Sequence, residues 1–129
     1  MRYKKPDPKN ALSIIESSKR TMDFTLNLEV NDKSGITIIR NIYECFRMLG
    51  DALLMIKGTI SEDHIMPIKE ISKIKIESSR PISSVENLRI LRHNVNYYGY
   101  IPNIIEVQDA KSLAESCFYK SYELIKKQL

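Results

Sequence analysis

The stretch from residue 35 to residue 57 constrains the fold more than any other part of the sequence. Large apolar side chains recur there at steps of three and four residues, which places them on one face of an α-helix. These apolar positions are Ile36, Ile39, Tyr43, Phe46, Gly50 and Leu53, broadened by Ile42 and Leu54. Gly58 follows and can adopt the left-handed conformation that ends many helices. The pattern predicts a long helix whose apolar face must be covered by other elements.

Two further long helices are predicted near the ends of the chain. The first opens near residues 7–8, because the proline there is tolerated in a first helical turn, and it runs to about Val30. The last runs from about Val107 to the C-terminus. Both segments carry apolar residues at helical steps, so each is expected to bury one face.

A shorter third helix is predicted after Ser61, because two acidic residues follow and acidic groups suit a helix N-terminus. Pro67 falls about two turns later, so the helix either begins later than Ser61 or bends. Isoleucines at three-residue steps extend the helical pattern to Ile74. The alternation of Ile74 and Ile76 with lysines also fits a short strand, although the helix is the favoured interpretation.

A fourth helix is predicted after the break that the proline at residue 81 imposes. Ser83 and Glu86 have the spacing of a capping box, in which each side chain bonds the other's backbone N–H. The helix ends at Gly99. Its apolar face is predicted to consist of Leu88, Leu91, Val95 and Tyr98.

These elements predict an all-α protein, an antiparallel bundle of four to five helices. Residues 1–129 are expected to form a single helical domain, with residues 1–6 as a flexible basic tail. No apolar span approaches the roughly 20 residues that cross a bilayer, and no signal sequence precedes the first helix, so a cytoplasmic protein without membrane contact is expected. Cys45 and Cys117 lie in apolar segments and are expected to be buried free thiols.

The fourth helix carries the residues in which chemistry is predicted. Arg89, Arg92, His93 and Asn96 form one polar stripe opposite the apolar face. Arginine suits bidentate capture of a phosphate, and a neighbouring histidine exchanges protons near neutrality. The stripe can therefore bind a phosphodiester and assist metal-free cleavage at a ribose 2′-hydroxyl. The competing interpretation pairs both arginines with Glu44 or Asp51 of the 35–57 helix.

Further residues are candidates for nucleic-acid contact. Arg47 can approach from the 35–57 helix, and Tyr97 can stack on a base beside the basic stripe. The net charge of +4 is too diffuse to predict polyanion binding by itself. His64 is expected to be a capping or surface residue. The two histidines, two cysteines and scattered carboxylates have no metal-ligand spacing, so neither a metal site nor a cofactor is predicted.

Several segments resemble the HEPN family (higher eukaryotes and prokaryotes nucleotide-binding), over about residues 11 to 125. Residues 43–58 are similar to the second helix of that family, and residues 14–28 to the helix before it. Asp63 and His64 after the loop, followed by residues 88–99, keep the family's order. The resemblance implies a helical bundle that forms a homodimer, often with the two fourth-helix stripes facing one cleft.

The resemblance also implies a choice of functions. Many HEPN proteins are metal-independent ribonucleases, frequently toxins paired with a nucleotidyltransferase antitoxin, and others have no known catalysis. Their motif is an Arg, commonly a polar residue, and a His after four to six residues. Arg92 and His93 match its first two positions, but the expected His is absent, since the intervals end at Tyr97, Tyr98 and Gly99. An RNA- or nucleotide-binding protein with an altered ribonuclease motif is therefore expected, with a non-catalytic interaction module as the alternative.

Overall fold

A computed structural model describes residues 2–129 of the chain, with Arg2 described by its backbone alone. The chain is mostly helical, which confirms the predicted all-α class. The elements in chain order are β1 (Arg2–Tyr3), α1 (Pro8–Leu26), α2 (Gly35–Lys57), β2 (Thr59–Ile60), α3 (Ile65–Ser72), a 3₁₀ turn (Ile82–Ser84), α4 (Val85–Tyr98) and α5 (Ile104–Lys126).

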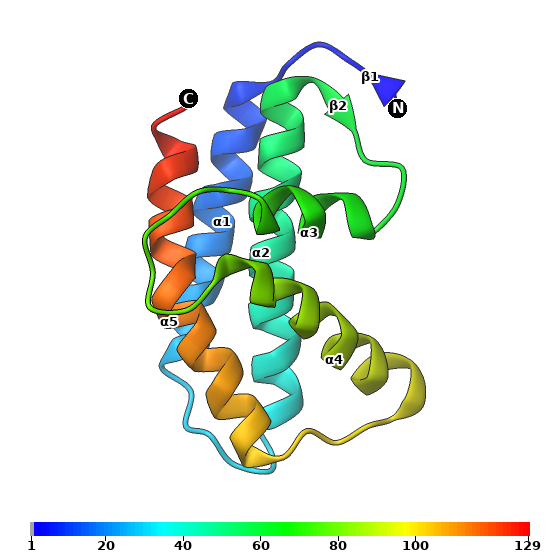
Figure 1. Cartoon of the computed structure of the whole chain (residues 1–129), viewed down its shortest axis with the longest axis vertical. Helices are drawn as coiled ribbons and strands as arrows, with labels where there is room; N and C mark the ends of the chain where they lie inside the picture. The colour runs from blue at the N-terminus through cyan, green and yellow to red at the C-terminus, as the bar shows by residue number, and fades with distance from the viewer. Residues whose placement is uncertain (1) are drawn as a thin grey trace.

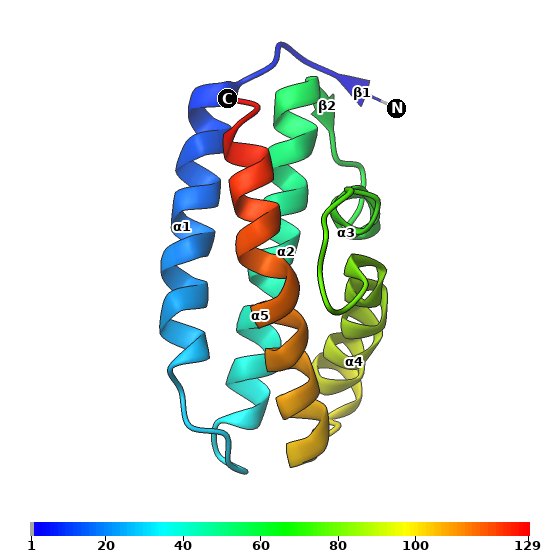
Figure 2. The ribbon, with the colours of Figure 1, turned by 60° about the vertical axis from the view of Figure 1, so that its left-hand side comes forward.

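Helix α2 is the centre of the molecule (Figures 1 and 2). Helix α1 runs antiparallel to it on one side, α3 and α4 lie on the other side, and α5 crosses the front. The predicted apolar face of α2 is buried except at Ile36, which is half-buried. Phe46 from that face meets Phe118 of α5 edge to face, with ring centroids 5.7 Å apart. This burial of apolar area is the main stabilising contribution to the fold. Cys45 and Cys117 are buried free thiols, as predicted.

Helix α3 is shorter than predicted because its last isoleucines leave the helical path. It begins at Ile65, which puts Pro67 in the first turn, where a missing N–H is tolerated. The later start is therefore the correct alternative. Ile74 and Ile76 lie in the connection after α3 and are half-buried against the core, so their assignment to a helix was wrong. The two side chains are partly buried from an irregular segment, so their apolar character did not require a helix or a strand.

The predicted capping box at residues 83–86 is also wrong. The serines there belong to the 3₁₀ turn, and neither the turn nor α4 has a side-chain cap bond. A capping box does form at the start of α5, where Asn103 Oδ1 accepts from the Glu106 backbone N–H and Glu106 Oε1 accepts from the Asn103 backbone N–H. Helix α5 consequently begins at Ile104, three residues before the predicted Val107.

The N-terminal segment pairs with the chain that follows α2. Gly58 ends α2 with φ of +70°, as its left-handed role predicts. The next residues form β2, which pairs antiparallel with β1, and the Lys4 backbone N–H donates to the Gly58 carbonyl oxygen at 2.7 Å. Residues 2–4, predicted as part of a flexible tail, are thus joined to the end of α2. Residue 1 lies outside the described residues.

Helices α2 and α3 approach so closely that only glycine fits at one point. A Cβ atom on Gly50 would lie 1.9 Å from the backbone oxygen of Pro67. This contact fixes the distance of α3 from α2, and with it the position of the residues just before α3.

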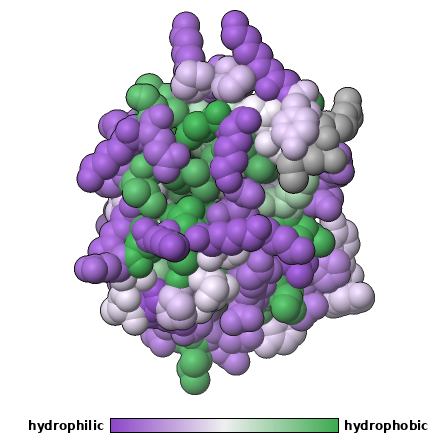
Figure 3. All heavy atoms as spheres, turned by 45° about the horizontal axis from the view of Figure 1, so that its top comes forward, coloured by the Kyte–Doolittle hydropathy of each residue, from purple (hydrophilic) through white to green (hydrophobic). Residues whose placement is uncertain are grey.

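The outer surface mixes polar and apolar residues. Figure 3 shows the end of the molecule that carries the two strands, where hydrophobic groups lie among hydrophilic ones. In the described part of the chain, no helix is both long and apolar enough to span a bilayer.

Candidate nucleic-acid interface

Helix α4 presents its predicted polar stripe away from the core. Val85, Leu88 and Val95 are buried, and Leu91 is half-buried against the core. The helical period therefore turns Arg89, Arg92 and His93 in other directions. Their placement follows directly from the apolar pattern of the sequence.

The three predicted catalytic residues line one surface hollow of about 340 Å³. Three parts of the chain form its wall: α2, the residues at the start of α3, and α4. The residues of this basic hollow are Tyr43, Asp63, His64, Ile65, Arg89, Arg92, His93 and Tyr97. The hollow brings together two guanidinium groups and two imidazoles, with one carboxylate.

Arg92 lies over the aromatic ring of Tyr43. The guanidinium carbon is 4.9 Å from the ring centroid, a cation–π geometry that holds the side chain across α2 without neutralising its charge. Burial raises the pKa of the Tyr43 hydroxyl, so this ring stays neutral. Among the described residues Arg92 has no ion-pair partner. Its charge remains available to an anion.

Arg89 is poorly satisfied by its own chain. Its Nε atom is buried and has no hydrogen-bond partner among the described residues. The nearest carboxylate oxygen, on Glu86, is 4.0 Å away, too far for a hydrogen bond. A buried N–H without an acceptor costs free energy, and an anionic ligand in the hollow would remove part of that cost.

His93 is exposed at the mouth of the hollow and packs against tyrosines. Its ring centroid is 4.7 Å from that of Tyr97 and 5.7 Å from that of Tyr98. Both tyrosines are open to solvent, with exposed fractions of 66% and 76%. The prediction that Tyr98 belongs to the core is wrong, because the last turn of α4 extends beyond the core at the edge of the bundle (Figure 1).

His64 reaches the same hollow from the start of α3. It occupies the N-cap position of α3 and is exposed, as a surface residue was expected to be, but its side chain makes no capping hydrogen bond. Asp63 does so instead, with Oδ1 accepting from the backbone N–H groups of Ile65 at 3.0 Å and Met66 at 2.9 Å. Sequence reasoning missed His64 as a neighbour of His93, although an Asp just before a helix is a recognisable capping signal.

Arg47 does not line the basic hollow. Its guanidinium is held by Glu44 and Asp51 on its own helix, and it faces a neighbouring hollow that includes His64. The hydrogen bond from Arg47 lowers the pKa of Glu44, whereas burial raises that of Asp51. These two carboxylates are therefore held by Arg47. In the described part of the chain no ion pair joins either of them to Arg89 or Arg92, so the competing interpretation that they pair with those arginines is wrong.

Asn96 continues the stripe beyond the hollow. Its Oδ1 accepts a hydrogen bond of 2.7 Å from Nε of Arg40, an exposed residue of α2. Arg40 was not predicted as a site residue, although its place in the sequence, four residues before Glu44, puts it on the same edge of the helix.

The described residues contain no cluster of three histidine, cysteine or carboxylate side chains able to hold a metal ion. Comparison of the chain with protein families, with curated proteins and with solved structures finds no match.

Proposed function

We propose that the basic hollow binds RNA or a nucleotide through its phosphates, in an HEPN-like protein. The observation that carries this proposal is the convergence of Arg89 and Arg92 on one open hollow. Among the described residues Arg92 has no ion-pair partner, and the carboxylate of Glu86 lies 4.0 Å from Nε of Arg89, too far for a hydrogen bond. Guanidinium groups bind phosphate oxygens in a bidentate manner, so a phosphodiester is the ligand that best matches both charge and shape.

Neighbouring residues extend this ligand chemistry. Tyr97 offers an exposed ring at the hollow on which a base can stack. Asn96, hydrogen-bonded to Arg40, extends the polar surface beyond the hollow, where a longer RNA could continue. His93 stands beside the arginines and can exchange a proton with a ribose hydroxyl. Metal-independent cleavage of RNA is the activity that this set of residues supports, and a homodimer would bring two such sets together.

The experiment that tests binding is fluorescence anisotropy with a labelled short single-stranded RNA, compared between Arg92→Ala and Lys126→Ala. Each variant removes one positive charge, but Lys126 lies on α5, paired with Glu16. We expect Arg92→Ala to raise the Kd about tenfold, which is about 1.4 kcal/mol, and Lys126→Ala to change it less than about twofold. If both variants raised the Kd equally, the binding would be explained by general attraction between the RNA and the net positive charge of the protein.

The second candidate function is a non-catalytic interaction module, for instance the partner of a nucleotidyltransferase in a toxin–antitoxin pair. The observation that favours it is an apolar surface from the end of α4 to the start of α5. Its exposed residues are Tyr97, Tyr98, Tyr100, Ile101, Ile104 and Ile105. Exposed apolar patches of this kind mark protein interfaces. Ile105→Glu is expected to abolish co-purification with such a partner while RNA binding persists, and the reverse pattern would exclude this alternative.

A further inference from the structure

Two imidazoles lie on one hollow although the packing of the chain requires neither. His64 comes from the start of α3 and His93 from α4, and both side chains are exposed. Asp63, not His64, satisfies the first N–H groups of α3. Among the described residues no hydrogen bond, ion pair or ring contact assigns the His64 ring a role in the fold, yet it lines the same hollow as His93.

The two rings reach the hollow from different walls. His93 lies on α4 with Arg89 and Arg92, beside the groups proposed to hold the phosphate. His64 comes from the start of α3. Cleavage of RNA at a ribose 2′-hydroxyl needs one group that accepts the proton of the hydroxyl and another that donates a proton to the leaving oxygen. Because His93 is proposed to act on the ribose hydroxyl, the leaving oxygen is the step at which the second imidazole can act.

We propose that His64 is a second catalytic residue of the hollow, the general acid that protonates the leaving group while His93 acts as general base on RNA. This inference rests on the proposed function, since the arginines must first bind the phosphodiester. It assigns a role to a residue outside the α4 stripe.

The reaction balances without a further reactant. His93 takes the proton of a ribose 2′-hydroxyl, and the 2′-oxygen attacks the adjacent phosphorus. The bond between phosphorus and the 5′-oxygen breaks, and the imidazolium of His64 gives its proton to that oxygen. The products are a 2′,3′-cyclic phosphate and a 5′-hydroxyl end, and exchange with water restores both rings. Arg89 and Arg92 hold the non-bridging oxygens, on which negative charge builds up.

The test compares two substrates in the presence of a metal chelator: an ordinary RNA dinucleotide linkage, and one in which sulfur replaces the bridging 5′-oxygen. A thiolate leaves without protonation, so the sulfur substrate needs no general acid. We expect His64→Ala to slow cleavage of the oxygen substrate at least about 100-fold, the lower range for general acid catalysis. On the sulfur substrate the same variant should stay within about threefold of the unaltered protein. His93→Ala should be slow on both substrates.

Controls separate the possible failures. Lys69→Ala changes an exposed residue on the same short helix and should cleave both substrates normally. The assignment would be overturned if His64→Ala lost the same fraction of its cleavage rate on both substrates, or if it cleaved the oxygen substrate at the normal rate. It would also be overturned if the sulfur substrate restored cleavage to His93→Ala and not to His64→Ala. RNA binding without any cleavage by the unaltered protein would also overturn it, while the proposed binding function would stand. Absence of RNA binding would remove the proposed function itself.

Discussion

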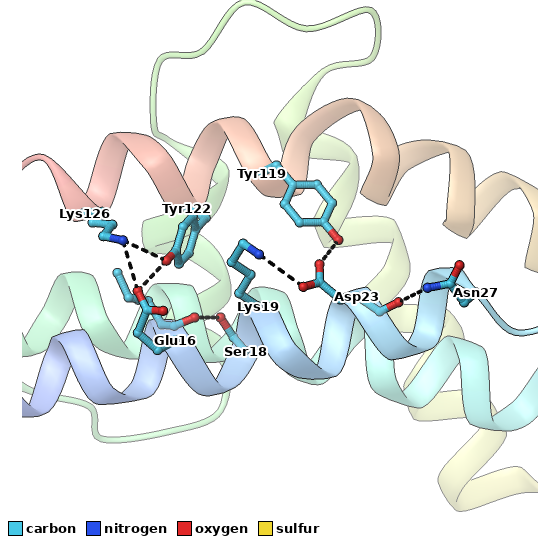
Figure 4. A network of polar contacts seen from close by, with 9 residues as sticks. Glu16, Ser18, Lys19, Asp23, Asn27, Tyr119, Tyr122 and Lys126 are labelled. Carbon is cyan, nitrogen blue, oxygen red and sulfur yellow. Dashed lines mark hydrogen bonds and ion pairs between the residues drawn. The ribbon is translucent and has the colours of Figure 1, made fainter.

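The α1–α5 surface and the α3–α4 surface differ in how their charged side chains are satisfied. Between α1 and α5, each carboxylate has both a tyrosine hydroxyl and a lysine ammonium group as partners (Figure 4). The lysine nitrogens lie 3.4 Å from the carboxylate in one cluster and 3.1 Å in the other. The two clusters are Glu16–Tyr122–Lys126 and Lys19–Asp23–Tyr119.

The arginines of the α3–α4 surface are less well satisfied by the described part of the chain. There Arg92 contacts the aromatic ring of Tyr43 and has no ion-pair partner, and the buried Nε atom of Arg89 has no hydrogen-bond acceptor, with the Glu86 carboxylate 4.0 Å away. On the α1–α5 surface the chain supplies partners for its charged side chains, whereas on the α3–α4 surface it leaves two arginines poorly satisfied. The poorly satisfied arginines are the difference between the two surfaces on which the proposed anion site rests.

The largest effect on the free energy of unfolding is expected from Gly50→Ala, because Gly50 of α2 contacts the backbone of α3 and the substitution therefore alters the α3–α4 side. The new Cβ would collide with the backbone of Pro67, so α3 must move outward. We expect a loss of about 2–3 kcal/mol in the free energy of unfolding, as for other overpacked sites, measured by urea denaturation. RNA binding should weaken as His64 moves with α3. Unchanged stability would mean that this contact does not fix α3.

A smaller effect is expected from Tyr119→Phe on the α1–α5 side. The Tyr119 hydroxyl donates to Asp23 Oδ1 at 2.5 Å, and this hydrogen bond is the main cause that lowers the pKa of Asp23. We expect a loss of up to about 1 kcal/mol at neutral pH, limited by solvent screening, with no change in RNA affinity.

The stability difference between Tyr119→Phe and the unaltered protein should depend on pH, in a direction set by the lowered pKa of Asp23. Because the folded pKa of Asp23 lies below its unfolded value, the stabilisation is complete above the unfolded pKa and is lost as the pH falls through the folded pKa. Unfolding curves of Tyr119→Phe and the unaltered protein should therefore converge in acid. A constant difference at all pH values would show that ring packing, and not the hydrogen bond, is responsible.

The smallest effect, and one of opposite sign, is expected from Arg89→Met. Methionine keeps much of the apolar stem but removes the buried N–H that lacks an acceptor. We expect a gain of about 0.5 kcal/mol in the free energy of unfolding together with weaker RNA binding. A loss of stability would indicate that Arg89 serves the fold and would weaken the contrast between the two surfaces.

The helices and the α4 stripe were predictable because they depend on local spacing. The period of Leu88 and Val95 fixes which way Arg89 and Arg92 face, and the structure agrees. His64 was not predictable as a neighbour of His93, because that proximity depends on the contact between residues 50 and 67 and on the path of the chain before α3.

The wrong predictions for Tyr98 and for the capping box also depend on features that the local spacing of residues does not report. Tyr98 has the spacing of a core residue, but α4 outlasts the core there, and no local pattern reports where a core ends. Arg47 stays a prediction for nucleic-acid contact; the structure shows that Glu44 and Asp51, three and four residues away, form ion pairs with it. The capping box was assigned to residues 83–86, whereas the bonds form at Asn103 and Glu106.

An NMR titration of the ¹⁵N-labelled protein with a short single-stranded RNA would locate the binding surface residue by residue. We expect the largest chemical-shift changes in residues 89–97 and at His64, with none at Glu16, Asp23 or their partners. Shift changes centred on the α1–α5 surface, or no saturable change at all, would contradict the proposed binding site.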